Sequence, residues 1–113
     1  MESFKSAIGN PQFISLDDVC NLIQTFSSKD DIGQSILAEK SYMVFCSKLS
    51  ITRAEYNSAG SAGHKPDMML VVDYDSYNKE KYLEYQGVKY SIYKTFGRKD
   101  GFIELYCEEK QGD

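Results

Sequence analysis

The chain lacks tryptophan, has only two prolines and one histidine, and contains no long hydrophobic run. A membrane-spanning helix needs about 20 predominantly apolar residues in a row, so the sequence predicts none. The N-terminus also lacks the charged-then-apolar pattern of a secretory signal peptide. We therefore expect a soluble protein that is made in the cytoplasm and has no membrane partner.

Residues suited to catalysis are scarce as well. His64 is the only histidine, and no serine or cysteine lies in a nucleophile motif such as a glycine-flanked elbow. Glu84, Glu104 and Glu108 are the remaining acid–base candidates, but each lies on the polar side of an alternating run, where a solvated carboxylate is expected. The sequence predicts no enzymatic activity and no cofactor.

One run of polar residues resembles a calcium-binding loop. Asp73 and Asp75 occupy its first and third positions, and Glu84 occupies its twelfth. The resemblance fails at the centre, where Tyr77 stands at the fifth position and Asn78 replaces the required glycine at the sixth. We interpret this run as a solvated turn and predict no metal site.

The three cysteines, Cys20, Cys46 and Cys107, are widely spaced among apolar or strand-like neighbours. This placement predicts reduced thiols in the core better than disulfides or zinc ligands. The nine tyrosines exceed what one small core needs, so we expect some of them to be half exposed with hydrated hydroxyl groups.

Acidic residues outnumber basic ones by 17 to 13, which gives a formal net charge of -4. Tight binding of nucleic acid needs an excess of lysine and arginine on one face. Four basic residues near one predicted hairpin do alternate with aromatic ones, as in a barrel that binds single strands; they are Lys89, Lys94, Arg98 and Lys99. Neighbouring acidic residues dilute this cluster, so an OB-like nucleic-acid-binding module is the alternative function.

At 113 residues the chain suits a single domain, residues 13–113, preceded by a loose N-terminal arm, residues 1–12. In the second half, alternation with a period of two predicts four strands, at residues 67–74, 82–85, 88–96 and 102–107. Gln86-Gly87 and Asp100-Gly101 provide hairpin turns, and Val88, Tyr90 and Ile92 are expected to face inward. We predict three consecutive antiparallel strands after a mostly buried one.

The first half admits two interpretations. Ser15 with Asp18 resembles a capping box and the apolar residues of segment 16–26 recur at helical spacing, which favours a helix. The turn at residues 30–33 and the alternating run 41–49 instead require a hairpin partner, which favours a strand at residues 19–26. We predict the strand and keep the helix open.

The segment between Thr52 and Pro66 changes in composition and is rich in glycine, alanine and serine. Loops of this length in a small domain are uncommon and tend to be functional. Residues 53–59 could form one helical turn. We therefore predict a projecting loop, residues 52–66, on an all-β domain of about six antiparallel strands.

Four short motifs carry a resemblance to a known family, and they are SITRAEY at residues 50–56, GHKP at 63–66, YSIYKT at 90–95 and IELYC at 103–107. Together they are similar to the head-closure (head completion, head–tail adaptor) family of siphophages and related prophages. The resemblance covers residues 50–110, and segment 18–49 is similar to the family's first hairpin. Where the family often has glycine after Asn78, this chain has Lys79.

This resemblance implies a small antiparallel β-barrel that forms a ring beneath the portal and its adaptor, closes the DNA-filled capsid and offers a platform for the tail. It implies a location in the virion after synthesis in the host bacterial cytoplasm. The partners would be the portal-adaptor (connector) protein, neighbouring copies in the ring and the tail-completion protein, and phage DNA would pass without tight binding. The implied stopper and assembly loop contains Arg53, Glu55, Tyr56, Asn57, Gly60, Gly63, His64, Lys65 and Pro66.

The sequence also bears on self-association. Its negative charge and the lack of a long apolar stripe give no obvious surface for a strong contact between copies. We therefore expect the isolated barrel to be a weak oligomer or a monomer.

Overall fold

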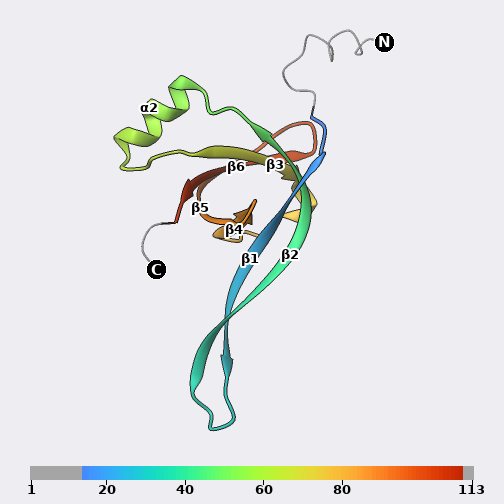
Figure 1. Cartoon of the computed structure of the whole chain (residues 1–113), viewed down its shortest axis with the longest axis vertical. Helices are drawn as coiled ribbons and strands as arrows, with labels where there is room; N and C mark the ends of the chain where they lie inside the picture. The colour runs from blue at the N-terminus through green and yellow to red at the C-terminus, as the bar shows by residue number, and fades with distance from the viewer. Residues whose placement is uncertain (1–13, 111–113) are drawn as a thin grey trace.

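The computed structural model describes residues 14–110, which form a closed six-stranded antiparallel barrel with one α-helix beside it (Figure 1). The predicted N-terminal arm, residues 1–12, lies outside the described residues. The elements are β1 (Asp18–Lys29), β2 (Ser35–Leu49), α2 (Arg53–Ser61), β3 (Met68–Asp73), the 3-10 turn η1 (Tyr74–Ser76), β4 (Tyr82–Tyr85), β5 (Val88–Gly97) and β6 (Phe102–Glu109). The predicted all-β barrel is confirmed.

The strands follow the order β1-β2-β3-β6-β5-β4 around the barrel, and β4 then pairs with β1. This closing seam is short, since it joins Asn21–Ile23 of β1 to Tyr82–Glu84 of β4. Beside it, the Tyr85 hydroxyl donates a hydrogen bond to the Asp18 carboxylate, which raises the pKa of Tyr85 to about 12. Closure leaves no open sheet edge within the barrel itself.

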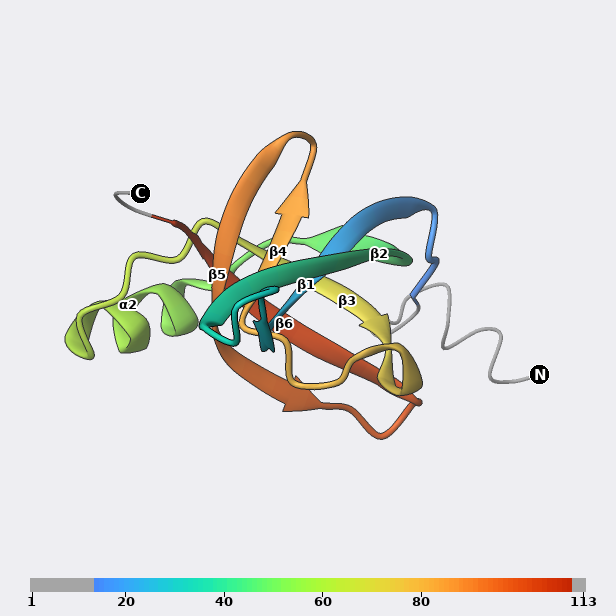
Figure 2. The same ribbon diagram turned by 90° about the horizontal axis from the view of Figure 1, so that it is seen from below.

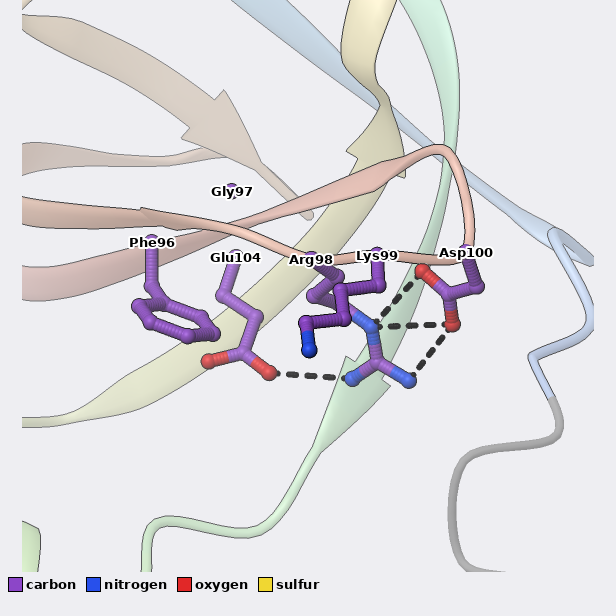
Figure 3. Close-up of a pocket in the computed structure, with 6 residues that line it drawn as sticks. All are labelled: Phe96, Gly97, Arg98, Lys99, Asp100 and Glu104. Carbon is purple, nitrogen blue, oxygen red and sulfur yellow. Dashed lines mark hydrogen bonds and ion pairs between the residues drawn. The ribbon is translucent and has the colours of Figure 1, made fainter.

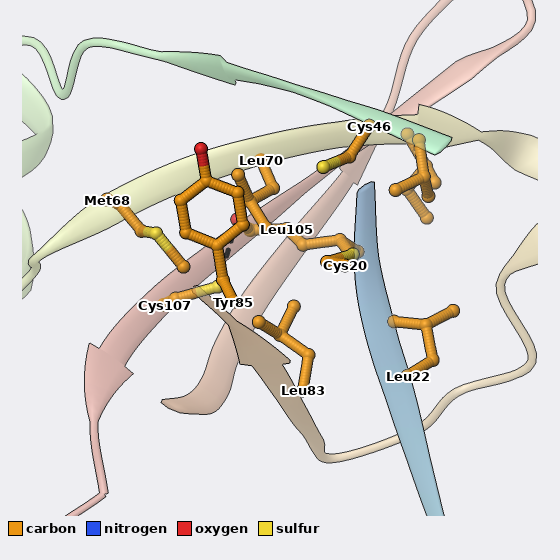
Figure 4. Packing of buried hydrophobic residues seen from close by; sticks show 11 residues of the cluster. Cys20, Leu22, Cys46, Met68, Leu70, Leu83, Tyr85, Leu105 and Cys107 are labelled. Carbon is orange, nitrogen blue, oxygen red and sulfur yellow. Dashed lines mark hydrogen bonds between the residues drawn. The ribbon is translucent and has the colours of Figure 1, made fainter. Parts of the chain in front are cut away.

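The core consists of buried side chains from β1, β2, β3, β4 and β6 (Figure 4), and the partly buried Tyr90 and Ile92 of β5 pack against it. Leu22, Leu70, Leu83 and Leu105 are fully buried, one from each of β1, β3, β4 and β6. Alternation is clearest in β6, where every second side chain is buried. β3 differs because Met68 to Val72 are all buried, so both faces of this strand are covered, as predicted for residues 67–74.

The predicted hairpins form, with differences at their ends. Gln86 and Gly87 both have positive φ (52° and 81°), so this turn adopts the conformation that hairpins favour although Gln replaces the usual Asn. At the β5–β6 turn only Gly101 has positive φ, and the loop closes through the Arg98 N–H, which donates to the Phe102 carbonyl at 2.8 Å. Val88, predicted to face inward, is exposed at the start of β5.

Segment 19–26 lies in strand β1, so the helical alternative is wrong. All twelve residues of β1 pair with β2, from Asp18 with Cys46 to Lys29 with Ser35. Strand β2 also begins six residues earlier than the predicted run at 41–49. Pairing with a long neighbouring strand satisfies the backbone of β1 in a way that local periodicity does not reveal.

The β1–β2 hairpin is much longer than the barrel needs. Beyond Ile23 strand β1 pairs only with β2, and before Cys46 strand β2 pairs only with β1. Residues 24–40 therefore leave the barrel as a two-stranded extension, called here the ribbon (Figures 1 and 2). The molecule measures 62 × 32 × 23 Å as a result.

The ribbon exposes large apolar side chains, although the sequence contains no long apolar stripe. Ile32 and Leu37 are about four-fifths exposed, and Phe26 and Ile36 are nearly half exposed. These residues are scattered among polar residues in the sequence, so no long apolar run indicates an exposed apolar surface. The hairpin register brings them onto one narrow projection.

The run that resembles a calcium loop folds around a buried carboxylate instead. Glu80 is only 3% exposed, and it accepts hydrogen bonds from the Tyr42 hydroxyl (2.7 Å) and the Asn78 backbone N–H (2.8 Å). Lys79 adopts a positive φ of 67° at the position where the resembling family has glycine. A buried carboxylate is costly unless hydrogen-bonded, and these donors satisfy it.

All three cysteines are buried and free, as predicted for core thiols. Burial raises the pKa of Cys107 to about 12. The pKa of Cys20 is also raised, first by the interaction of its thiol with Cys46 and then by burial. We predict that a thiol reagent at pH 8 labels the native protein no faster than it unfolds. The measurement is labelling with a chromogenic disulfide, with urea-unfolded protein as the control; rapid native labelling of all three thiols would contradict the assigned packing.

Candidate assembly surface

The segment predicted to be a projecting loop is largely a helix. Arg53–Ser61 forms α2 with nine residues, more than the one turn expected for residues 53–59. The Thr52 hydroxyl caps its start by accepting the Glu55 N–H at 3.1 Å. At its end the Gly63 N–H donates to Gly60 and the His64 N–H to Ala59. These two bonds define a Schellman motif, and Gly63 has the positive φ (88°) that it requires.

Helix α2 is attached to the barrel at its first turn through Glu55. This carboxylate accepts a hydrogen bond from the Tyr93 hydroxyl at 3.0 Å and forms an ion pair with Lys94. Both partners come from β5, about 40 residues later in the chain. Ala59 is the only helix residue within α2 that is buried, so the apolar contact of the helix with the barrel is small.

A second attachment lies just after the helix. One carboxylate oxygen of Glu108 in β6 is hydrogen-bonded to His64 Nδ1 at 2.8 Å, and the other accepts a hydrogen bond from the Lys65 backbone N–H at 3.0 Å. The His64 ring stacks on Tyr93 with 4.6 Å between ring centroids. Pro66, which follows, is buried against the barrel. Burial alone would raise the pKa of Glu108, but the bonds from Lys65 and His64 outweigh it and lower that pKa.

A β-bulge explains why Tyr93 reaches both attachments. Ile92 pairs with Cys107 and Lys94 with Tyr106, so Tyr93 is an extra residue in β5 without an opposite partner. Bulges redirect side chains near functional surfaces. Tyr93, predicted to face outward, is therefore covered by the helix segment, and burial with its bond to Glu55 raises its pKa.

The predicted loop residues therefore fall into two groups. Glu55, Gly63, His64, Lys65 and Pro66 attach or terminate the helix. The others, Arg53, Tyr56, Asn57 and Gly60, are exposed to solvent. Tyr56 is half exposed, and a Cβ added at Gly60 would meet no heavy atom within 4 Å. Helix α2 stands beside the barrel (Figure 1). The four exposed residues recur at helical spacing on one side of it, called here the free helix face.

The basic residues of the predicted nucleic-acid cluster mostly pair with carboxylates. Lys89 pairs with Glu39, and Lys94 pairs with Glu55. Arg98 lies in a shallow pocket at the β5–β6 turn, where it bonds Asp100 and Glu104 at 2.8 and 2.9 Å (Figure 3). The Arg98 guanidinium holds the pKa of Asp100 below its ordinary value. These pairs fasten a turn and leave little uncompensated positive charge for phosphates.

Glu104 and Glu108, predicted to be solvated, are therefore structural partners of Arg98 and His64. His64 is 44 residues from Glu108, and Arg98 lies across the β5–β6 turn from Glu104, so alternation within strand β6 alone could not identify either partner. The sequence does contain a local signal for the helix, since Thr52 with Glu55 has the spacing of a capping box and Gly63 marks a helix end. Within residues 14–110, no group of three His, Cys, Asp or Glu side chains is placed to hold a metal ion.

No protein-family model and no curated protein matches the chain. Its structure is similar to the solution structure of protein SF1141 from Shigella flexneri 2a, with a TM-score of 0.69 and 13% sequence identity. The match covers 87% of this chain and 96% of that one, so the two share the fold over nearly their whole length. None of the helices in residues 14–110 is long and apolar enough to cross a membrane.

We predict that Tyr93→Phe loosens helix α2 while leaving the barrel folded. The variant keeps the stacking on His64 but removes the donor to the Glu55 carboxylate, a loss of about 1.5 to 3 kcal/mol, the range for a hydrogen bond to a charged group. Hydrogen exchange followed by mass spectrometry should show faster exchange in peptides spanning residues 53–62 and unchanged exchange in β3. Tyr74→Phe serves as the control, and equal protection of α2 in all three proteins would contradict the attachment through Glu55.

The second attachment should depend on pH. Because the pKa of Glu108 is lowered by folding, its contribution is present above the ordinary carboxyl value and is lost as the pH falls through the folded pKa. We expect the amide NMR resonances of His64 and Lys65 to move with the protonation of Glu108 in this acidic range. Glu108→Gln should abolish that transition; its persistence in this variant would show that another group is responsible.

Proposed function

We propose that this chain is a structural protein of the phage head–tail connector, located in the virion, that forms a ring under the portal and its adaptor. In this role it closes the DNA-filled capsid and offers a platform for the tail, acting by shape and symmetry and not by catalysis. The observation that carries the proposal is the free helix face, a polar and aromatic surface on a segment that the barrel holds by only two polar attachments.

The small contact between α2 and the barrel suits a stopper. A segment that blocks a channel and later clears it must move without unfolding its domain, and such segments have few buried apolar contacts. Here one alanine is buried within the helix, and hydrogen bonds and ion pairs join the segment to Tyr93, Lys94 and Glu108. The apolar contacts after the helix are limited to the His64 ring on Tyr93 and to Pro66. The portal-adaptor protein, neighbouring copies and the tail-completion protein are the proposed partners of the surfaces around the barrel.

The charge distribution agrees with DNA that passes without tight binding. The chain has a net charge of -4, and Lys89, Lys94 and Arg98 are each paired with carboxylates. A channel lining with uncompensated lysines would hold the phosphates and slow ejection. For the OB-like alternative, the same pairing lowers the affinity expected for a single strand, and a binding assay at two salt concentrations separates the two functions because electrostatic binding weakens steeply with salt.

The proposal predicts that the free helix face is needed for closure and not for folding. We expect Tyr56→Ala to leave the thermal melt within about 0.5 kcal/mol of the wild type, as for surface substitutions generally. In the phage that encodes the chain, the variant should yield fewer infectious particles and more heads that leak DNA or lack tails. Complementation titres and electron microscopy of the heads are the measurements.

Tyr74→Ala is the matched control, because Tyr74 has a similar exposure at the barrel but lies outside the assembly segment. A replacement of residues 57–63 by a shorter Gly-Ser linker extends the test, and it should package DNA yet fail to retain it. Normal complementation titres from both the Tyr56 variant and the shortened segment would contradict the stopper role. A collapsed melt of the shortened protein would show that this segment belongs to the core.

A further inference from the structure

The ribbon of residues 24–40 has the features of a docking arm. A two-stranded hairpin is marginally stable by itself in water, and its outer edges carry unpaired backbone groups that can template pairing with another chain. Beyond the barrel, β1 and β2 pair with each other alone. Six residues of β1 lie in this ribbon, Gln24 to Lys29, so it extends about 20 Å from the barrel. Such an extension is explained most simply if another surface covers it.

The inner face of the ribbon is apolar near its tip. Residues of β1 and β2 alternate between two faces, and the register places Phe26 opposite Ala38 and Ser28 opposite Ile36 on one of them. This face continues the row of Cys20 and Leu22, which fill the core. Past the barrel the row meets no further strand, so Phe26 and Ile36 remain exposed.

A second apolar patch lies on the opposite face of the same two strands, where they form the barrel wall. Val19 pairs directly with Phe45, and Met43 is the next residue of β2 on that face. Phe45 and Met43 are 59% and 60% exposed, far more than the barrel's inward residues. We call Val19, Met43 and Phe45 the wall patch.

We propose that the ribbon of one copy lies against the wall patch of a second copy. The two apolar surfaces face opposite ways on one hairpin, so a copy cannot cover its own wall patch, and one contact leaves a ribbon and a patch free for the next copies. A head-to-tail contact of this kind closes into a ring when its rotation allows. The ribbon reaches about 20 Å beyond the barrel, and the two shorter dimensions of the whole molecule are 32 and 23 Å, so the ribbon can cross much of the width of a neighbouring copy.

This proposal rests on the ring of the proposed function for its biological meaning, but the contact itself can be tested with the purified chain. We would prepare Ile36→Cys and Met43→Cys separately and oxidise them alone and in an equal mixture at high protein concentration. The native cysteines are buried, so the oxidised wild type sets the background. The expected result is a disulfide-linked dimer in the mixture only, and a ladder of larger products from a chain that carries both substitutions.

Dimers from either single variant alone would indicate a symmetric contact and overturn the head-to-tail arrangement. A mixture that stays at the wild-type background, or that matches Ile36→Cys mixed with Lys99→Cys as the distant control, would overturn the contact altogether. Adding Phe26→Lys to the ribbon partner should lower the yield of mixed dimer about tenfold, because an unpaired charge would be buried. Phe96→Lys, exposed elsewhere, should leave it unchanged.

The two proposals can fail separately. Cross-linking that follows the expected pattern, together with a phage that closes its heads without this chain, would remove the connector role and leave the contact standing. Heads that require the chain, together with a mixture that never cross-links, would remove the contact and leave the connector role.

Discussion

The three-residue seam between β1 and β4 is the constraint on which the rest of the structure depends. It closes the sheet on itself, so the leucines of four different strands can share one core. It also determines where the barrel ends, because β1 loses its second neighbour after Ile23. Everything that β1 and β2 contribute past this point stands outside the barrel as a ribbon. Closure and projection are thus consequences of the same register.

Helix α2 is also held in place by few contacts. The helix has local reasons to form, with the Thr52 cap at its start and the Schellman motif at Gly63, yet it buries only Ala59 within its length. Its position is determined by two carboxylates. Glu55 on the helix bonds Tyr93 and Lys94 of β5, and Glu108 on β6 bonds His64 and the Lys65 backbone just after the helix. Polar attachments of this kind have specific geometry and modest net free energy, so the helix can be held in place without becoming part of the core.

Tyrosine hydroxyl groups act mainly as internal fasteners. Tyr42 donates to Glu80, Tyr85 to Asp18 and Tyr93 to Glu55, and these three bonds join segments far apart in the chain. Tyr106 donates to Glu104 within the same strand, β6. The expectation that some tyrosines are half exposed is confirmed for Tyr56 and Tyr74, which are 50% and 56% exposed. The structure uses an aromatic body for packing and a polar tip for a specific carboxylate.

The sequence by itself determined the strands of the second half, the turns between them, the burial of the three cysteines and the unusual composition of residues 52–66. These follow from local rules, since alternation with a period of two and glycine at positive φ need no distant partner. The sequence favoured a strand at residues 19–26, which the structure confirms, and the structure removes the helical alternative. Only the tertiary structure decided that Tyr93 is bulged toward the helix and that Glu80 and Glu108 are held by residues elsewhere in the chain. It alone also revealed the ribbon and the wall patch, because exposure of Phe26, Ile36 and Phe45 depends on where other strands end, and no local pattern encodes the position of a distant neighbour.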